Sequence, residues 1–235
     1  MSFRSMLENV KSAGNLGRPR LRPRPAPRTR PGIEPLEGRS LLSTFTVVNT
    51  LDTPANSSTI PPGSLRDAIT RVNADTQPGV DTINFAIGSG AKTIKLGYYA
   101  LPTIKHSVVI DGTSQPGFAG TPLIELDGTT ATNNGGNGLY VLAGNSTVKD
   151  LVINRFNGYG IFLVHNGGDT ITGNYIGTDV TGTVALGNRN GGLQIYSGTG
   201  DIIGGTMAAT RNLISGNGPS RSVSSATHAP SRISS

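Results

Sequence analysis

The sequence predicts an all-β fold in which short parallel strands wind into a solenoid, a parallel β-helix, with one short helix near its N-terminal end. Three observations predict it. Similar apolar segments recur about every 22–23 residues, glycine makes up 33 of the 235 residues, and only one stretch has helical periodicity. A repeat of this length is typical of solenoids, in which each repeat buries its apolar face against the next.

The clearest repeat is a glycine followed by alternating apolar residues. It occurs as GLYV from residue 138, GIFL from residue 160 and GLQI from residue 192. A second series consists of Ile153, Ile176 and Ile214, and a third of Val148, Ile171 and Ile202. Extra residues fall in segments 178–188 and 206–210, which we expect to be loops.

A coil of this length fits three strands of about four residues joined by three turns. Alternation sends Leu139 and Val141 inward, and stacking of successive coils turns such pairs into aliphatic ladders. Glycine and asparagine tolerate the left-handed backbone that tight turns require, which accounts for the glycine content. Earlier, less regular coils are expected at 93–96, 108–112 and 123–128.

The one predicted helix spans about 64–73, with Ser64 as its N-cap. Its apolar residues at helical spacing are Leu65, Ala68, Ile69 and Val72. Strands are expected on either side of it, at 44–48 and 81–85, where β-branched and aromatic residues are frequent. A helix at this point would cover the end of the solenoid, which otherwise exposes strand edges and apolar core.

These segments resemble a known family. The run GSLRDAITRVN (63–73), followed by DTINF (81–85), resembles the N-terminal entry of CSLREA-like bacterial surface proteins. The phrases GNYIGTDVTGTVALGN and RNLISGNG resemble repeat units of bacterial pectate-lyase-like β-helix proteins. The resemblance covers roughly 44–218. It implies a right-handed parallel β-helix whose open end is covered by the short helix.

The positive charge lies outside the predicted solenoid. Residues 1–42 carry nine basic and three acidic residues, the tail 219–235 adds two arginines, and the segment 43–218 has nine bases against eleven acids. Arginine alternates with proline in the first segment, so we expect a disordered basic leader. Binding of nucleic acid through this leader is disfavoured, because no aromatic residue interleaves its arginines.

Both ends carry a further signal. The leader's segment 36–43 (LEGRSLLS) resembles the LEPR-XLL motif of large exported planctomycete proteins, which implies an extracellular or cell-surface location. No standard secretory signal and no membrane-spanning segment is recognisable. The tail 219–235 is rich in serine without apolar periodicity, so we expect it to be disordered, and one hypothesis is that the solenoid is truncated there.

No catalytic, metal or cofactor site is predicted. The chain has no cysteine, its three histidines are far apart in the sequence, and we expect most of its aspartates to lie in turns. The least scattered charged group is Lys149, Asp150 and Arg155. If the chain is an enzyme, we expect a polysaccharide lyase or glycoside hydrolase that uses these residues, since the resembling fold class includes such enzymes.

A surface for sugars is the remaining candidate site. Tyr140, Phe162 and Gln194 occupy equivalent outward positions on successive coils, and Tyr196 follows two residues later. Exposed rings could stack on sugars; alternatively, they stack on one another beneath a loop. The leading hypothesis is a non-enzymatic exported or cell-surface scaffold, adhesin-like, which binds polysaccharide or cell-envelope components and is a monomer or part of a longer surface protein. The enzyme is the alternative.

Overall fold

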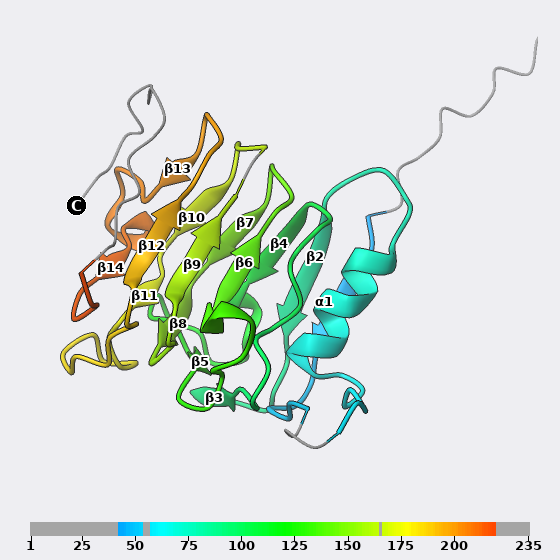
Figure 1. Cartoon of the computed structure of the whole chain (residues 1–235), viewed down its shortest axis with the longest axis horizontal. Coiled ribbons are helices and arrows are strands. Elements are labelled where there is room, and N and C mark those ends of the chain that lie inside the picture. Colours follow the sequence, from blue (N-terminus) through cyan, green and yellow to red (C-terminus); the bar gives the residue numbers. More distant parts are fainter. Residues whose placement is uncertain (1–41, 54–56, 165, 220–235) are drawn as a thin grey trace, which may run out of the picture. The chain divides into compact units, whose positions relative to one another are not determined.

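The computed structural model describes residues 42–53, 57–164 and 166–219 (Figure 1). These residues form parallel β-sheets with one α-helix, which confirms the all-β parallel architecture predicted from the sequence. The helix is α1 (Leu65–Ala74), and the strands are β1 (Thr44–Val47), β2 (Asp81–Phe85), β3 (Lys92–Lys95), β4 (Val108–Asp111), β5 (Ile124–Asp127), β6 (Leu139–Val141), β7 (Thr147–Lys149), β8 (Leu151–Asn154), β9 (Tyr159–Leu163), β10 (Thr170–Thr172), β11 (Tyr175–Ile176), β12 (Gly191–Ile195), β13 (Ile202–Ile203) and β14 (Leu213–Ile214).

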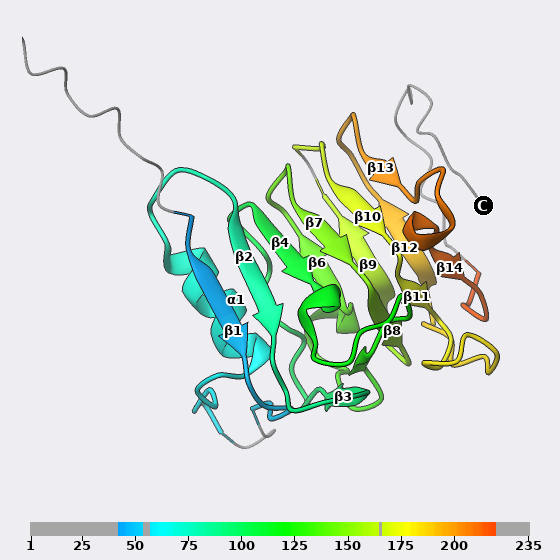
Figure 2. The ribbon, with the colours of Figure 1, turned by 180° about the vertical axis from the view of Figure 1, so that it is seen from behind.

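The strands pair in parallel into three separate sheets. The six-stranded sheet has the order β1-β2-β4-β7-β10-β13, the five-stranded sheet β14-β11-β8-β5-β3, and the three-stranded sheet β12-β9-β6. From β4 onward the chain visits the six-, five- and three-stranded sheets in turn and then begins again. Strands from equivalent points of successive coils therefore lie side by side (Figures 1 and 2).

The core consists of apolar ladders that run across these coils. In the three-stranded sheet the inward positions align as Leu139, Ile161 and Leu193, and as Val141, Leu163 and Ile195. The first two members of each ladder are buried, whereas the third members are only partly buried. Burial of apolar surface stabilises the fold by about 25 cal/mol per Å². The repeat found in the sequence thus corresponds to a stack of buried side chains.

One predicted ladder is displaced by a residue. Ile171 pairs with Ile203, whereas Ile202, the predicted member, pairs with Thr170 and is 55% exposed. Two adjacent isoleucines leave the alternation ambiguous, and a slip of one residue reverses the face of every side chain. The turn before β13 decides the register, because Asp201 Oδ1 accepts a hydrogen bond from the Asp169 backbone N–H at 2.9 Å.

Buried asparagines hold the turns between sheets. Asn174 Oδ1 accepts the Leu151 N–H at 3.0 Å, and its Nδ2 donates to the Val148 carbonyl at 2.9 Å. Asn188 repeats this arrangement at another turn, where it accepts the Phe156 N–H at 3.0 Å. A turn buried between coils leaves backbone groups without partners unless side chains supply them, and the amide can both donate and accept.

Helix α1 packs against β1 and β2 at the first strands of the six-stranded sheet (Figure 2). Ser64 is its N-cap and accepts the Asp67 N–H at 3.2 Å, as the sequence predicts. The apolar residues on its buried face are Leu65, Ala68, Ile69 and Val72. The helix therefore shields apolar core at this end of the sheet.

Several expectations fall outside the described residues. The basic leader (1–42) is described only at Leu42, and the tail (219–235) only at Pro219. The disorder expected for both segments stays a prediction, as does the export signal within 36–43. In the described part of the chain, no helix has the length and apolar character needed to cross a membrane.

Candidate functional site

The three residues predicted to form a sugar-binding surface do align on the outer face of the three-stranded sheet. Tyr140 of β6 pairs with Phe162 of β9, which pairs with Gln194 of β12. The Tyr140 and Phe162 rings are stacked, with centroids 5.3 Å apart and an interplanar angle of 28°. All three side chains are partly buried. Parallel pairing in register brings together residues that lie 22 and 32 positions apart in the sequence.

Two further rings extend this group, which we name the aromatic row: Tyr140, Tyr159, Phe162, Gln194 and Tyr196. Tyr159 stacks on Phe162 at 5.5 Å, and Tyr196 meets Phe162 edge-on at 6.3 Å. Tyr196 is the most open, with 56% of its surface exposed. The sequence predicted the position of Tyr196 but missed Tyr159, which lies three residues before Phe162 and so breaks the alternation.

Stacking between neighbours determines what the row presents to solvent. Rings that stack at 5.3–5.5 Å turn their faces toward one another, so mainly their edges and hydroxyl groups point outward. Such ring pairs contribute about 1 kcal/mol each. The rings therefore stack on one another, which is the second of the two arrangements expected from the sequence. The aromatic row is an uneven surface and not a flat one.

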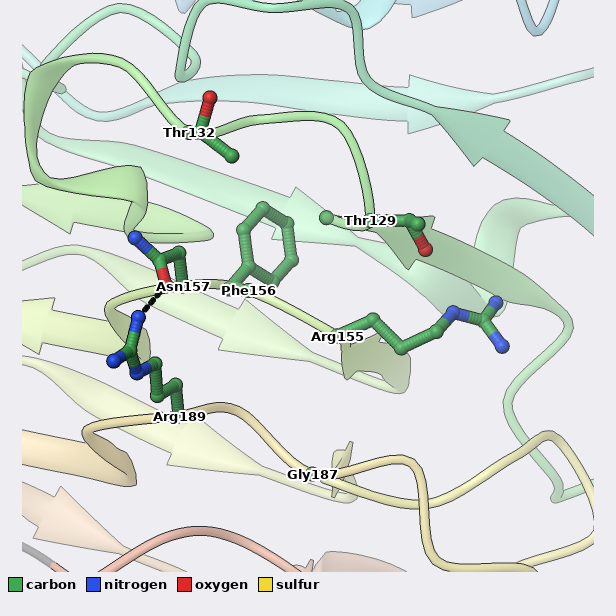
Figure 3. Close-up of a pocket in the computed structure, with 8 residues that line it drawn as sticks. Thr129, Thr132, Arg155, Phe156, Asn157, Gly187 and Arg189 are labelled. Carbon is green, nitrogen blue, oxygen red and sulfur yellow. Dashed lines mark hydrogen bonds between the residues drawn. The ribbon is translucent and has the colours of Figure 1, made fainter.

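An open cleft of about 360 Å³ lies next to the starts of β9 and β12. It is lined by Gly128, Thr129, Thr132, Arg155, Phe156, Asn157, Gly187 and Arg189 (Figure 3). The buried Phe156 ring packs against Gly128, where an added Cβ would overlap the ring. The remaining side chains supply hydroxyl, amide and guanidinium groups, which are hydrogen-bonding partners for a polar ligand.

Asn157 and Arg189 are cross-coil neighbours in this cleft. Each stands two residues before the start of its strand, and Arg189 Nη1 donates to Asn157 Oδ1 at 3.0 Å. Asn157 is also only two residues from Tyr159 of the aromatic row, so cleft and row meet at the same strand ends. The sequence analysis missed this pair; aligning the repeat glycines Gly160 and Gly192 places Asn157 opposite Arg189.

Arg155 lies at the other side of the cleft and is neutralised. Its guanidinium donates to Glu125 Oε1 at 2.9 Å and to Asp127 Oδ1 at 3.0 Å. In Figure 3 it points away from Arg189. Burial alone would raise the pKa of Asp127, but hydrogen bonds from Thr129 and then the charge of Arg155 outweigh burial and lower it. Arg155 thus acts within a local charge network.

The structure does not bring the three predicted catalytic candidates into one group. Asp150 and Arg155 flank the four residues of β8, which places them about 16 Å apart along the strand. Lys149 forms an ion pair with Asp111, with Nζ 2.9 Å from Oδ2. Burial raises the pKa of Asp150 to about 6; the charge of Lys149 opposes this shift and that of Asp111 adds to it.

Polar and ionisable side chains near the start of the six-stranded sheet make contacts in pairs. His106 Nε2 lies 3.6 Å from Asp81 Oδ2, and Ser43 donates to Asp75 Oδ2 at 2.7 Å near the start of the six-stranded sheet. Over the ranges that the structure describes, no three histidine, aspartate or glutamate residues are grouped so that they could hold a metal ion.

Similarity to known proteins adds no further constraint on the site. A scan against protein-family models finds no family that matches the chain, and a search of curated proteins finds none similar to it.

Proposed function

We propose that residues 43–218 form a right-handed parallel β-helix that serves as an exported or cell-surface scaffold, adhesin-like and non-enzymatic. The rotation of the chain through three parallel sheets and the ladders in register support the β-helix. The resemblance of segments 36–43 and 63–73 to surface-protein sequences supports the location. A rigid solenoid of this kind presents one surface of side chains along its length, which suits binding of an extended ligand.

The ligand that we propose is a polysaccharide chain, bound along the aromatic row and the adjoining cleft. The observation that carries this proposal is the meeting of the two features at the starts of β9 and β12, where Asn157 precedes Tyr159. Sugars offer hydroxyl groups for hydrogen bonds and C–H faces for aromatic contact. The cleft supplies the first kind of partner through Thr129, Asn157 and Arg189, and Tyr196 supplies the second.

Substitutions in the row test this proposal. We expect Tyr140→Ala and Phe162→Ala to weaken binding by about tenfold or more, a loss of about 1.4 kcal/mol, because each removes a ring and unsettles its stacked neighbour. Affinity electrophoresis of the full chain in gels containing xylan, mixed-linkage glucan or polygalacturonate measures the effect. Tyrosine fluorescence provides a second readout, since the chain has six tyrosines and no tryptophan.

The matched control is Tyr98→Ala. Tyr98 is 44% exposed and packs edge-on against Tyr99 at 5.2 Å, in a loop outside the aromatic row. This variant should bind like the wild type. Equal retardation of wild type, Tyr140→Ala and Phe162→Ala in every gel would refute the sugar-binding surface, provided that thermal unfolding shows each variant folded.

The same incubations test the enzymatic alternative. Asp150 has a raised pKa, which is typical of a general acid or base, and lies beside Lys149. A non-enzymatic scaffold forms no new reducing ends or unsaturated products. If they appear with the wild type and vanish with Asp150→Asn, the chain is a polysaccharide-cleaving enzyme instead. Asparagine suits the left-handed backbone of this position (φ +56°), so the substitution preserves the turn.

A further inference from the structure

Two buried polar atoms face each other without a hydrogen bond at the start of the six-stranded sheet. They are Oδ2 of Asp81, the first residue of β2, and Nε2 of His106, in the loop before β4. The two atoms are 3.6 Å apart, and the Asp81 side chain is only 4% exposed. Neither atom has a hydrogen-bond partner in the described part of the chain. Buried polar atoms are nearly always paired, so this exception calls for an explanation.

The contacts around these two atoms join four segments of the chain. Asp81 Oδ1 accepts the backbone N–H of Ser43 at 3.1 Å, and Ser43 stands directly before β1. The Ser43 hydroxyl donates to Asp75 Oδ2 at 2.7 Å, and Asp75 is the C-cap of α1. The Asp81 N–H donates to the Ser107 carbonyl at 3.1 Å, next to His106. We name Ser43, Asp75, Asp81 and His106 the strand-start junction.

Carboxyl groups from two elements act on His106. They are Asp81 of β2 and Asp75 at the end of α1. The pKa of Asp75 is lowered first by the serine hydroxyl that it accepts and, less strongly, by the charge of His106. On its own loop, His106 follows Lys105, which is exposed. The next coil contacts this loop through residues 144–146, which are uncharged.

A proton on His106 supplies the contact that the junction lacks. A protonated imidazole donates from both of its nitrogens, so Nε2 can then donate to Asp81 Oδ2. Hydrogen bonds between charged partners are shorter and stronger than neutral ones. Histidine is the side chain that changes its charge between about pH 5 and 8. The junction therefore gains an ion pair as the pH falls through this range and loses it as the pH rises.

We propose that the strand-start junction is a pH-sensitive latch: protonated His106 holds the start of β1 and the end of α1 against β2, and loss of the proton loosens them. A group that gains a partner for its protonated form stabilises the fold at low pH and loses this effect as the pH rises. Carboxylates in general take up protons below about pH 4, so the latch is closed in weakly acidic solution. It is independent of sugar binding, since the aromatic row and the cleft lie on other strands.

Hydrogen exchange of the full chain at pH 5.5 and pH 8 tests the latch. After correction for the intrinsic pH dependence of exchange, we expect protection of β1 and of the last turn of α1 to fall about tenfold at pH 8. Protection of β7 and β8 should change much less, because the junction lies at the first strands of the sheet. Mass spectrometry on peptides from these regions measures the change, and this comparison needs no variant.

Two variants assign the effect to His106. His106→Gln keeps a polar side chain that cannot take up a proton, so its β1 peptides should show the same corrected protection at both pH values. The matched control is Lys105→Gln on the same loop. The Lys105 side chain is exposed and makes no ion pair in the described part of the chain, so this variant should keep the tenfold fall.

Three results would overturn the proposal. One is wild-type protection of β1 that is equal at the two pH values. Another is a fall that persists undiminished in His106→Gln or disappears in Lys105→Gln. The third is an equal fall in β1, β7 and β8, which would show that alkaline pH loosens the whole fold and not the junction.

Discussion

At the scale of single residues, acidic side chains take the place of asparagine at one series of turns. Asp169 Oδ1 accepts the Ser146 N–H at 2.8 Å, and Asp201 accepts that of Asp169 in the next coil. Asp81 does the same for Ser43 at the start of the stack. The geometry matches that of Asn174, but the carboxylates are buried near one another. Burial raises the pKa of Asp169 to about 6; the Ser146 N–H opposes the shift and the charge of Asp201 adds to it.

We predict that Asp169→Asn stabilises the fold at neutral pH. The pKa of Asp169 rises from 3.8 to about 6 on folding, so its stabilising contribution is complete below pH 3.8 and is lost as the pH rises through 6. Asparagine keeps the acceptor oxygen without this loss. The gain in free energy of unfolding should be near zero at pH 4 and approach at most about 3 kcal/mol at pH 7.5. Urea titrations at the two pH values measure it.

The control for this prediction is Asp179→Asn in an exposed loop. Burial would raise the pKa of Asp179, but hydrogen bonds from the backbone of Val184 and from Thr181 and Thr183 lower it overall. A carboxyl group whose pKa is lowered on folding stabilises the fold at pH values above the pKa that it has in the unfolded chain. Asp179→Asn removes this group and should therefore lower the free energy of unfolding at pH 7.5. A pH-independent effect of Asp169→Asn would contradict the assigned burial of its charge.

At the scale of elements, the attachment of α1 depends on one buried ion pair. Arg66 in the first turn of the helix holds Asp52 with two hydrogen bonds, at 2.6 and 2.9 Å. Its remaining N–H groups donate to the carbonyls of Tyr99 and Ala100, both at 2.8 Å. Both charged side chains are almost fully buried. The guanidinium thus joins the helix to two loops that are distant in sequence.

We predict that Arg66→Ala destabilises the fold by about 3–5 kcal/mol, because it leaves the Asp52 charge buried without a partner. Arg66→Lys should recover only part of this loss, since an ammonium group cannot reproduce the two-pronged contact. The free energy of unfolding in urea measures both. Arg71→Ala on the same helix is the control: its side chain is 60% exposed, and its 4.0 Å pair with Asp67 contributes little. Equal losses for Arg66→Ala and Arg71→Ala would disprove the assignment.

At the scale of the whole molecule, the first and last strands of the parallel sheets differ in how far other parts of the described chain cover them. The first strand, β1, is covered by α1, whereas no strand in the described part of the chain pairs with the outer edge of β13 or β14, and Ile214 is 44% exposed. Each coil in a stack of this kind is stabilised mainly by contacts with its neighbours, so a coil with one neighbour opens more easily than a coil with two.

We predict a gradient of hydrogen exchange along the stack. In dilute protein, amides of β13 and β14 should exchange at least about tenfold faster than those of β7 and β8, and amides of β1 should be protected by α1. Exchange monitored by mass spectrometry on peptides from each region measures the gradient. Uniform protection from β1 to β14 would contradict the gradient.

Much of the fold could be predicted because it repeats. The ladder of Leu139, Ile161 and Leu193 was predictable from alternation, and the helix from its cap at Ser64, since both signals are local. The residue that β13 contributes to the third ladder could not be predicted. Ile202 and Ile203 both fit the alternating pattern, and only the turn at Asp201 decides which of them points inward. Local patterns identify faces, whereas register depends on contacts between coils.

The alignment of three residues of the aromatic row could be predicted from the sequence. Equivalent repeat positions placed Tyr140, Phe162 and Gln194 together, which the pairing of their strands bears out. The sequence named Lys149, Asp150 and Arg155 only as the least scattered charged group. In the structure, strand β8 lies between Asp150 and Arg155, and Lys149 pairs with Asp111. The cleft at Arg189 and Asn157 arises only where two turns from different coils meet.

The sequence by itself determined the all-β parallel architecture, the single helix and the alignment of the aromatic row, because these follow from periodicity and capping within short segments. Only the tertiary structure decided which charges pair, that the rings stack on one another, and that Ile203 and not Ile202 continues the ladder of Ile171. These properties depend on distances between side chains of different coils. Periodicity indicates which side chains share a face, but not how closely they approach across it.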